Sequence, residues 1–123
     1  MPKVNFSKDK PAWTEWRWYE AEVVNVQLTK SQADNDMLVC IIRMDKARGI
    51  IRKYLTWHTE WTTQQTGNFL HALNPGSDEL DINWMLLSLR NGVIPMEQLM
   101  LKKFMLQPYY DDNGFVMINA ETI

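Results

Sequence analysis

Hydrophobic and polar residues alternate most clearly over residues 50–57. Alternate side chains of an extended chain point to opposite faces, so this segment has one apolar face and one polar or aromatic face. The first face holds Ile51, Leu55 and Trp57, and the second holds Arg52, Tyr54 and Thr56. We therefore expect a strand whose apolar face packs against the core and whose other face, with Arg52 and Tyr54, is exposed and available for binding.

The chain before this strand has the pattern of two more strands. Residues 13–28 alternate until the apolar series slips by one position at Val23–Val24, which predicts a long first strand bent by a β-bulge. Residues 37–45 are apolar almost throughout. A short turn ending in Gly49 then predicts a tight hairpin with the strand at 50–57.

Two later segments have the spacing of helices. Thr59 is a suitable N-cap for a first helix, which Asn74–Pro75 ends. Asp78 or Asp81 can cap a second helix, which Asn91–Gly92 ends. The apolar side of the second helix consists of Ile82, Met85, Leu86 and Leu89.

The end of the chain completes the element order. Residues 95–100 predict one further helical turn, and residues 103–110 and 115–118 flank the hairpin turn sequence Asp-Asp-Asn-Gly. Three strands, one or two helices and two strands is the order of an all-β, five-stranded OB-fold, a Greek-key barrel. We expect one such domain over residues 13–123, preceded by an extended basic arm over residues 1–12.

Composition adds an aromatic excess and a charge gradient. Six tryptophans among 123 residues exceed the usual number, and aromatic residues beyond the needs of a core often form binding surfaces. The net charge is -2, but residues 1–57 hold ten Lys/Arg against seven Asp/Glu (+3), and residues 58–123 hold three against eight (-5). A surface that binds anions is therefore expected in the first half of the chain.

Four short segments are together similar to one protein family. They are Tyr19–Val23 in the first strand, Arg52–Leu55 in the third, Phe69–Leu73 in the first helix and Lys103–Phe104 in the closing hairpin. Over roughly residues 16–119, the chain resembles phage-type single-stranded DNA-binding proteins with an OB-fold. It departs from that pattern at Leu101, where a glycine is common, and in ending without an acidic tail.

The resemblance implies sequence-tolerant binding of single-stranded DNA during phage replication or recombination, in the cytoplasm of an infected host cell. Replication or recombination proteins and further copies of the chain are the protein partners that it suggests. Recruitment of partners through an acidic tail is not expected.

Binding a single strand requires aromatic rings for base stacking beside cations for phosphates. Arg52 and Tyr54 supply both on one strand face, and Arg43 belongs to the same hairpin. The first strand adds two indole rings, the hairpin tip adds two cations, and the closing hairpin adds a phenol ring. The predicted DNA-binding residues are Trp16, Trp18, Arg43, Lys46, Arg48, Arg52, Tyr54 and Tyr109.

Other residues are expected to have structural roles. Trp57 shares a face with Leu55, and Trp61 begins a packing helix, so both are expected in the core. Lys53 falls on the core side of its strand and would have to reach water along its aliphatic stem.

Catalytic and metal-binding chemistry has little support in the sequence. His58 and His71 lie in no HExxH or CxxC motif, and the chain has no glycine-rich phosphate loop or nucleophile elbow. We therefore expect that the chain is not an enzyme and that it binds neither a metal ion nor a cofactor. Cys40 is the single cysteine, so no disulfide is expected within the chain, which suits the reducing cytosol. No apolar stretch has the length of a signal peptide or a membrane helix, so we expect a soluble protein that does not associate with a membrane.

A protein-interaction module of the same fold is the alternative function, for instance a phage inhibitor of a host enzyme. Trp16, Trp18 and Tyr54 would then anchor the interface with a partner protein. The modest net charge and the acidic second half favour this alternative.

Overall fold

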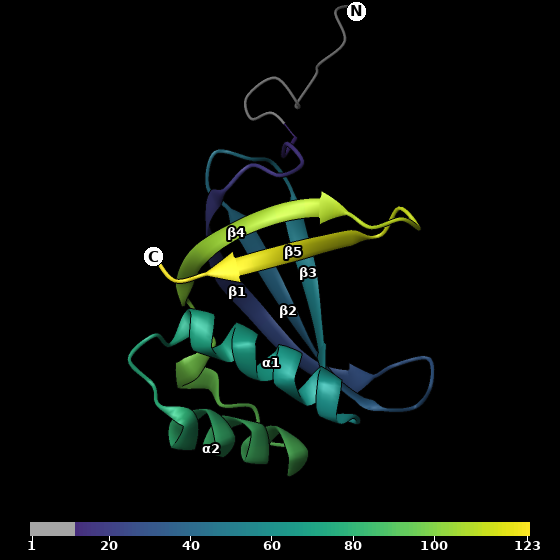
Figure 1. The fold of residues 1–123 in the computed structure, drawn as a ribbon, viewed down its shortest axis with the longest axis vertical. Coiled ribbons are helices and arrows are strands. Elements are labelled where there is room, and N and C mark those ends of the chain that lie inside the picture. Colours follow the sequence, from purple (N-terminus) through teal and green to yellow (C-terminus); the bar gives the residue numbers. More distant parts are fainter. Residues whose placement is uncertain (1–11) are drawn as a thin grey trace, which may run out of the picture.

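A computed structural model describes residues 12–123 of the chain. Its elements follow the expected order of three strands, two helices and two strands (Figure 1). The strands are β1 (Tyr19–Lys30), β2 (Asp36–Met44), β3 (Ile50–Thr56), β4 (Lys103–Tyr110) and β5 (Val116–Glu121). The helices are α1 (Glu60–Leu73), α2 (Glu79–Arg90) and the short 3₁₀ turn η2 (Met96–Gln98).

The five strands form one antiparallel sheet in the order β3-β2-β1-β4-β5. β1 lies in the middle because its first part pairs with β4 and most of its length pairs with β2. The register of β1 and β2 shifts between Val23 and Asn25, at the predicted bulge. β4 and β5 cross in front of β2 and β3 at a steep angle (Figure 1), so the sheet is strongly coiled.

A Greek-key barrel was expected from the element order, and within residues 12–123 the sheet does not close into one. β3 and β5 end the strand order, and no ladder joins them. The fold is thus a coiled antiparallel sheet of five strands with two helices.

The core lies between the inner face of this sheet and α1. Alternation turns one set of strand residues inward, among them Ile42, Leu55, Phe104 and Leu106, and all four are buried. The ring of Phe69 on α1 meets that of Phe104 edge to face, with 5.5 Å between the ring centroids. The core thus joins the first helix to the sheet.

Capping boxes begin both helices. The Thr59 hydroxyl accepts a bond from the backbone N–H of Thr62, and the Asp78 carboxylate accepts one from the N–H of Asp81. α1 lies between the sheet and α2, and α2 turns Met85, Leu86 and Leu89 inward (Figure 1). α2 is thus an outer layer whose far side is free of the body of the protein.

Three sequence predictions need correction or lie outside the structure. The first strand begins at Tyr19 rather than Trp13, because Trp16 has a positive φ of 69° that breaks the extended chain. Trp61 is 71% exposed rather than buried, whereas Trp57 is buried as predicted. The basic arm predicted over residues 1–12 falls, apart from its last residue, outside the described residues.

Among the described residues, no helix combines the length and the apolar character needed to cross a bilayer.

Candidate nucleic-acid interface

The outward face of β2 and β3 brings together three of the predicted residues. Arg52 and Tyr54 project from β3, and both are exposed, Tyr54 to 55%. The ladder places Arg52 opposite Ile41 and Tyr54 opposite Val39, so partly exposed aliphatic side chains lie beside them. We call these residues and Arg43 the β2–β3 face. It offers a ring, cations and an apolar floor on one surface.

Arg43 on this face is bound to an acid. Its Nη2 donates to Oε1 of Glu22 on β1 at 2.8 Å, across the β1–β2 ladder. Arg52 takes part in neither of the two ion pairs found within residues 12–123. A phosphate can therefore reach Arg52 directly but must compete with Glu22 for Arg43.

Trp16 and Tyr109 form a stacked aromatic pair on the outer side of β4. Their ring centroids are 4.5 Å apart and their planes differ by 11°. The backbone holds Trp16 in place, because its N–H donates to the carbonyl of Pro108 at 2.8 Å and its carbonyl accepts from Nε2 of Gln107 at 2.7 Å. Trp16 remains 55% exposed, so its ring is held in place from one side and open to solvent elsewhere.

A second aromatic pair fixes the same segment from the inner side of β4. Trp13 packs against Tyr110 with 5.0 Å between ring centroids, and the Glu15 carboxylate accepts from the backbone N–H of Tyr110. The Tyr19 hydroxyl, in turn, accepts from the N–H of Thr14. Residues 13–18 thus pack against both sides of the end of β4, and these contacts fix the orientation of the Trp16 ring.

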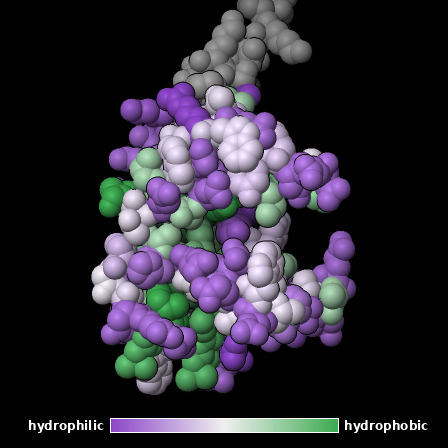
Figure 2. Space-filling view, in the orientation of Figure 1, coloured by the Kyte–Doolittle hydropathy of each residue, from purple (hydrophilic) through white to green (hydrophobic). Residues whose placement is uncertain are grey.

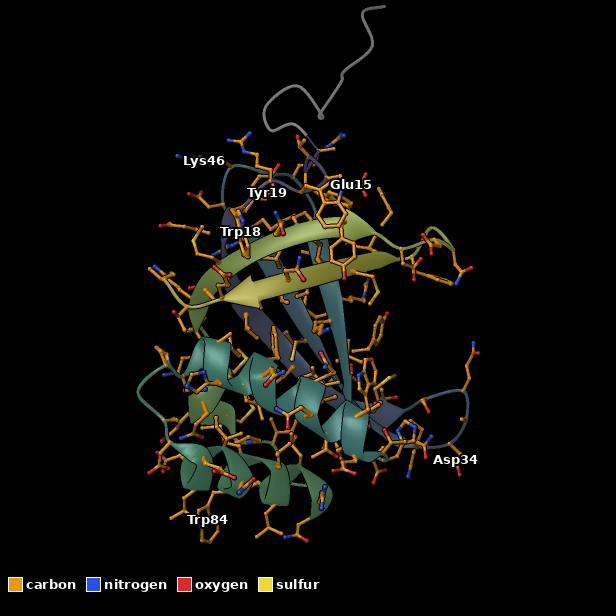
Figure 3. The ribbon with its side chains drawn as sticks, in the orientation of Figure 1. Glu15, Trp18, Tyr19, Asp34, Lys46 and Trp84 are labelled. Atoms are coloured by element: carbon orange, nitrogen blue, oxygen red, sulfur yellow. The ribbon has the colours of Figure 1, made fainter. Side chains whose placement is uncertain are left out.

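Trp18 and Lys46 lie near each other at this end of the sheet (Figure 3). Both line a shallow hollow of about 270 Å³, together with Arg17, Glu20 and Asp45. Two acids offset the two cations there, so the hollow is a weaker phosphate site than the β2–β3 face. Arg48 is exposed in the adjoining β2–β3 turn.

The eight predicted residues therefore do not form one compact site. The sequence predicted Trp16 on the first strand, but Trp16 precedes β1, and its ring stacks on Tyr109 of β4. The ladders place Tyr54 level with Gln27, near the other end of β1. The aromatic rings are thus distributed along the outer side of the sheet, and a strand that contacted all of them would have to follow β1.

One exposed aromatic residue in a suitable position, Phe115, is not among the residues predicted from the sequence. Phe115 lies at the tip of the β4–β5 hairpin, and its backbone N–H and carbonyl both bond to Asp111. The hairpin turn signal next to an aromatic residue could have identified it. Asp111 and Asp112 make this tip acidic, so stacking is more compatible with the site than phosphate binding is.

The inner side of the β2–β3 hairpin carries an unusual pair of polar groups. Lys53 lies opposite Cys40 in the β2–β3 ladder, on the core side, as its position in the alternation predicted. Burial lowers the pKa of the Lys53 ammonium and raises the pKa of the Cys40 thiol to about 12. Neither group faces the outer surface of the sheet.

No group of three or more His, Cys, Asp or Glu side chains that could hold a metal ion occurs in residues 12–123. Comparisons with known protein families and with curated proteins find no match to this chain.

Proposed function

We propose that this chain is a sequence-tolerant single-stranded DNA-binding protein of phage type, acting in replication or recombination, and that its open, coiled sheet is the partly open Greek-key barrel of an OB-fold. The strand order supports the fold, since β1 pairs with both β2 and β4 and α1 connects β3 to β4. The exposed ring of Tyr54 next to the exposed cation of Arg52 is the observation that carries the proposed function.

A base would stack on Tyr54, over the aliphatic side chain of Val39. Stacking of this kind contributes roughly 1 to 3 kcal/mol per base and tolerates any sequence, because every base has a π-face. Arg52 is two residues away on the same strand face, about 7 Å along β3, and would pair with a neighbouring phosphate.

Trp16 would provide a separate stacking position. Its ring is held on Tyr109 before any ligand arrives, so little side-chain freedom remains to be lost when a base stacks on it. A longer strand could then use both Trp16 and the β2–β3 face, and a short one only one of them.

Anisotropy of a fluorescein-labelled oligothymidine, titrated with protein at several salt concentrations, tests the proposal. Wild-type affinity should fall as salt rises, because bound phosphates release counterions. Tyr54→Ala should weaken binding by roughly 5-fold to 100-fold, from the loss of one stacked base. Arg52→Ala should reduce the slope of log affinity against log salt by about 0.7, the value for one phosphate contact on a single strand.

Trp61→Ala is the matched control, because Trp61 is an exposed aromatic residue on α1, which packs on the inner side of the sheet, whereas the β2–β3 face is on the outer side. It should leave the affinity unchanged. Absence of binding at low salt would refute the proposed function. Equal losses for Tyr54→Ala and Trp61→Ala would refute the assignment of the site.

A further inference from the structure

α2 carries a second apolar side that the core does not use. Leu80, Trp84 and Leu87 are all exposed, Trp84 to 64%. At about 100° per residue, these positions lie within about 60° of one another and opposite the buried Met85 and Leu89. We call these three residues the α2 stripe. Apolar side chains gather at the lower edge of the molecule, where Figure 1 places α2 (Figure 2).

Charges beside the α2 stripe are arranged symmetrically about its centre. Glu79 and Arg90 lie at opposite ends of α2 and, eleven residues apart, on the same flank of the helix. Their midpoint falls at Trp84–Met85. Neither takes part in the two ion pairs found within residues 12–123. Nη2 of Arg90 donates only a long hydrogen bond, 3.4 Å, to the hydroxyl of Thr63 on α1, which an ion pair with Glu79 of a second copy would replace.

This pattern is complementary to itself. A two-fold axis near Trp84 would place a second α2 antiparallel to the first, with stripe against stripe. The same operation would put Glu79 of each copy opposite Arg90 of the other, giving two equivalent ion pairs. The helix dipoles would also be antiparallel, with each acidic N-terminus beside a basic C-terminus.

We propose that the α2 stripe is the interface of a homodimer, in which two copies pack their α2 helices antiparallel around Trp84. DNA is a poor occupant of this surface, because Asp78, Glu79 and Asp81 make its N-terminal end acidic. Trp84 lies at the opposite end of the molecule from Trp18 and Lys46 (Figure 3), so the dimer leaves that end of the sheet free. The dimer does not depend on the proposed DNA binding.

Sedimentation equilibrium from micromolar to millimolar concentrations measures the self-association directly. Trp84→Ala should weaken the dimer by at least about tenfold, as expected for a central aromatic anchor. Trp61→Ala, which removes an equally exposed indole from α1, should leave it unchanged. A wild-type chain that remains monomeric throughout, even at millimolar concentration, would overturn the proposal and leave the stripe to a different protein.

Charge reversal tests the antiparallel arrangement. Glu79→Arg alone would set arginine against arginine at both ion pairs, and Arg90→Glu alone would set glutamate against glutamate. Each variant should dimerise at least about fivefold more weakly than wild type. An equimolar mixture of the two variants restores both ion pairs, so it should form a heterodimer of wild-type strength.

Heterodimer formation would also show that both variants are folded, with far-ultraviolet circular dichroism of each variant as an independent check. Folded variants whose mixture associates no better than either alone would overturn the antiparallel interface.

Discussion

Lys53 is a residue whose environment opposes its charge. It lies on the core side of β3, and burial lowers the pKa of its ammonium group below the usual 10.5. In the pH range between the lowered pKa and 10.5, the unfolded chain binds a proton that the folded chain has released. Stability therefore rises with pH across this range, and below it the unfavourable burial of the charge is present in full.

Lys53→Met should accordingly stabilise the protein at neutral pH, by on the order of 1 kcal/mol, because it keeps the aliphatic stem and removes the charge. The gain should shrink as the pH approaches 10.5, where the wild-type amine loses its charge in the unfolded chain as well. Urea unfolding of wild type and variant at several pH values measures both effects.

Lys103→Met on β4 is the control, since Lys103 is exposed. This variant should change stability by less than about 0.5 kcal/mol, with no pH trend that resembles the one expected for Lys53→Met. If Lys53→Met proved destabilising at neutral pH, the Lys53 ammonium would have a partner in solution that stabilises it by more than burial destabilises it.

At the scale of elements, the turn before β4 contains a strained residue. Leu101 has a positive φ of 61°, in the left-handed region that disfavours side chains with a Cβ. The turn is held by a bond from its N–H to the carbonyl of Val23 at 2.8 Å, next to the bulge of β1. Glycine, by contrast, takes this conformation without strain.

Leu101→Gly should therefore stabilise the protein, by up to about 1 kcal/mol after the greater chain entropy of glycine is subtracted. Little packing would be lost, because the side chain is 64% exposed. Thermal unfolding followed by circular dichroism measures the change.

Gln65→Gly is the contrasting substitution, since Gln65 is exposed within α1 and has an ordinary helical backbone. It should destabilise by about 1 kcal/mol. A similar loss for Leu101→Gly would mean that the turn does not depend on left-handed geometry.

For the whole molecule, local patterns predicted the elements better than their arrangement. The alternation around Tyr54 and the cap at Thr59 are local signals, and both are confirmed in the structure. Trp61 was wrongly predicted to lie in the core, although the helical spacing of α1 indicates that it is exposed. It lies five residues before the buried Thr66, about 140° around the helix, and so points away from the core.

The candidate interface was harder to predict, because its geometry depends on contacts distant in sequence. Trp16 and Gln107 are 91 residues apart, and only the β4 register brings the Trp16 ring onto Tyr109. The ion pair between Glu22 and Arg43 likewise depends on the register of β1 and β2, which shifts at the bulge between Val23 and Asn25. Residue types can suggest stacking and phosphate binding, but the coiling of the sheet decides which of them share a surface.

Because Cys40 is buried, its thiol can be used to measure how often the sheet opens. Its thiol lies at the centre of β2 with no exposed surface, and its pKa of about 12 leaves almost no reactive thiolate at neutral pH. Alkylation of Cys40 by a maleimide should therefore occur only when β2 separates from its neighbours and exposes the thiol. The labelling rate, relative to that of the urea-unfolded chain, then reports the free energy of opening, with no engineered probe. Rapid labelling under native conditions would instead reveal a sub-global motion that exposes β2.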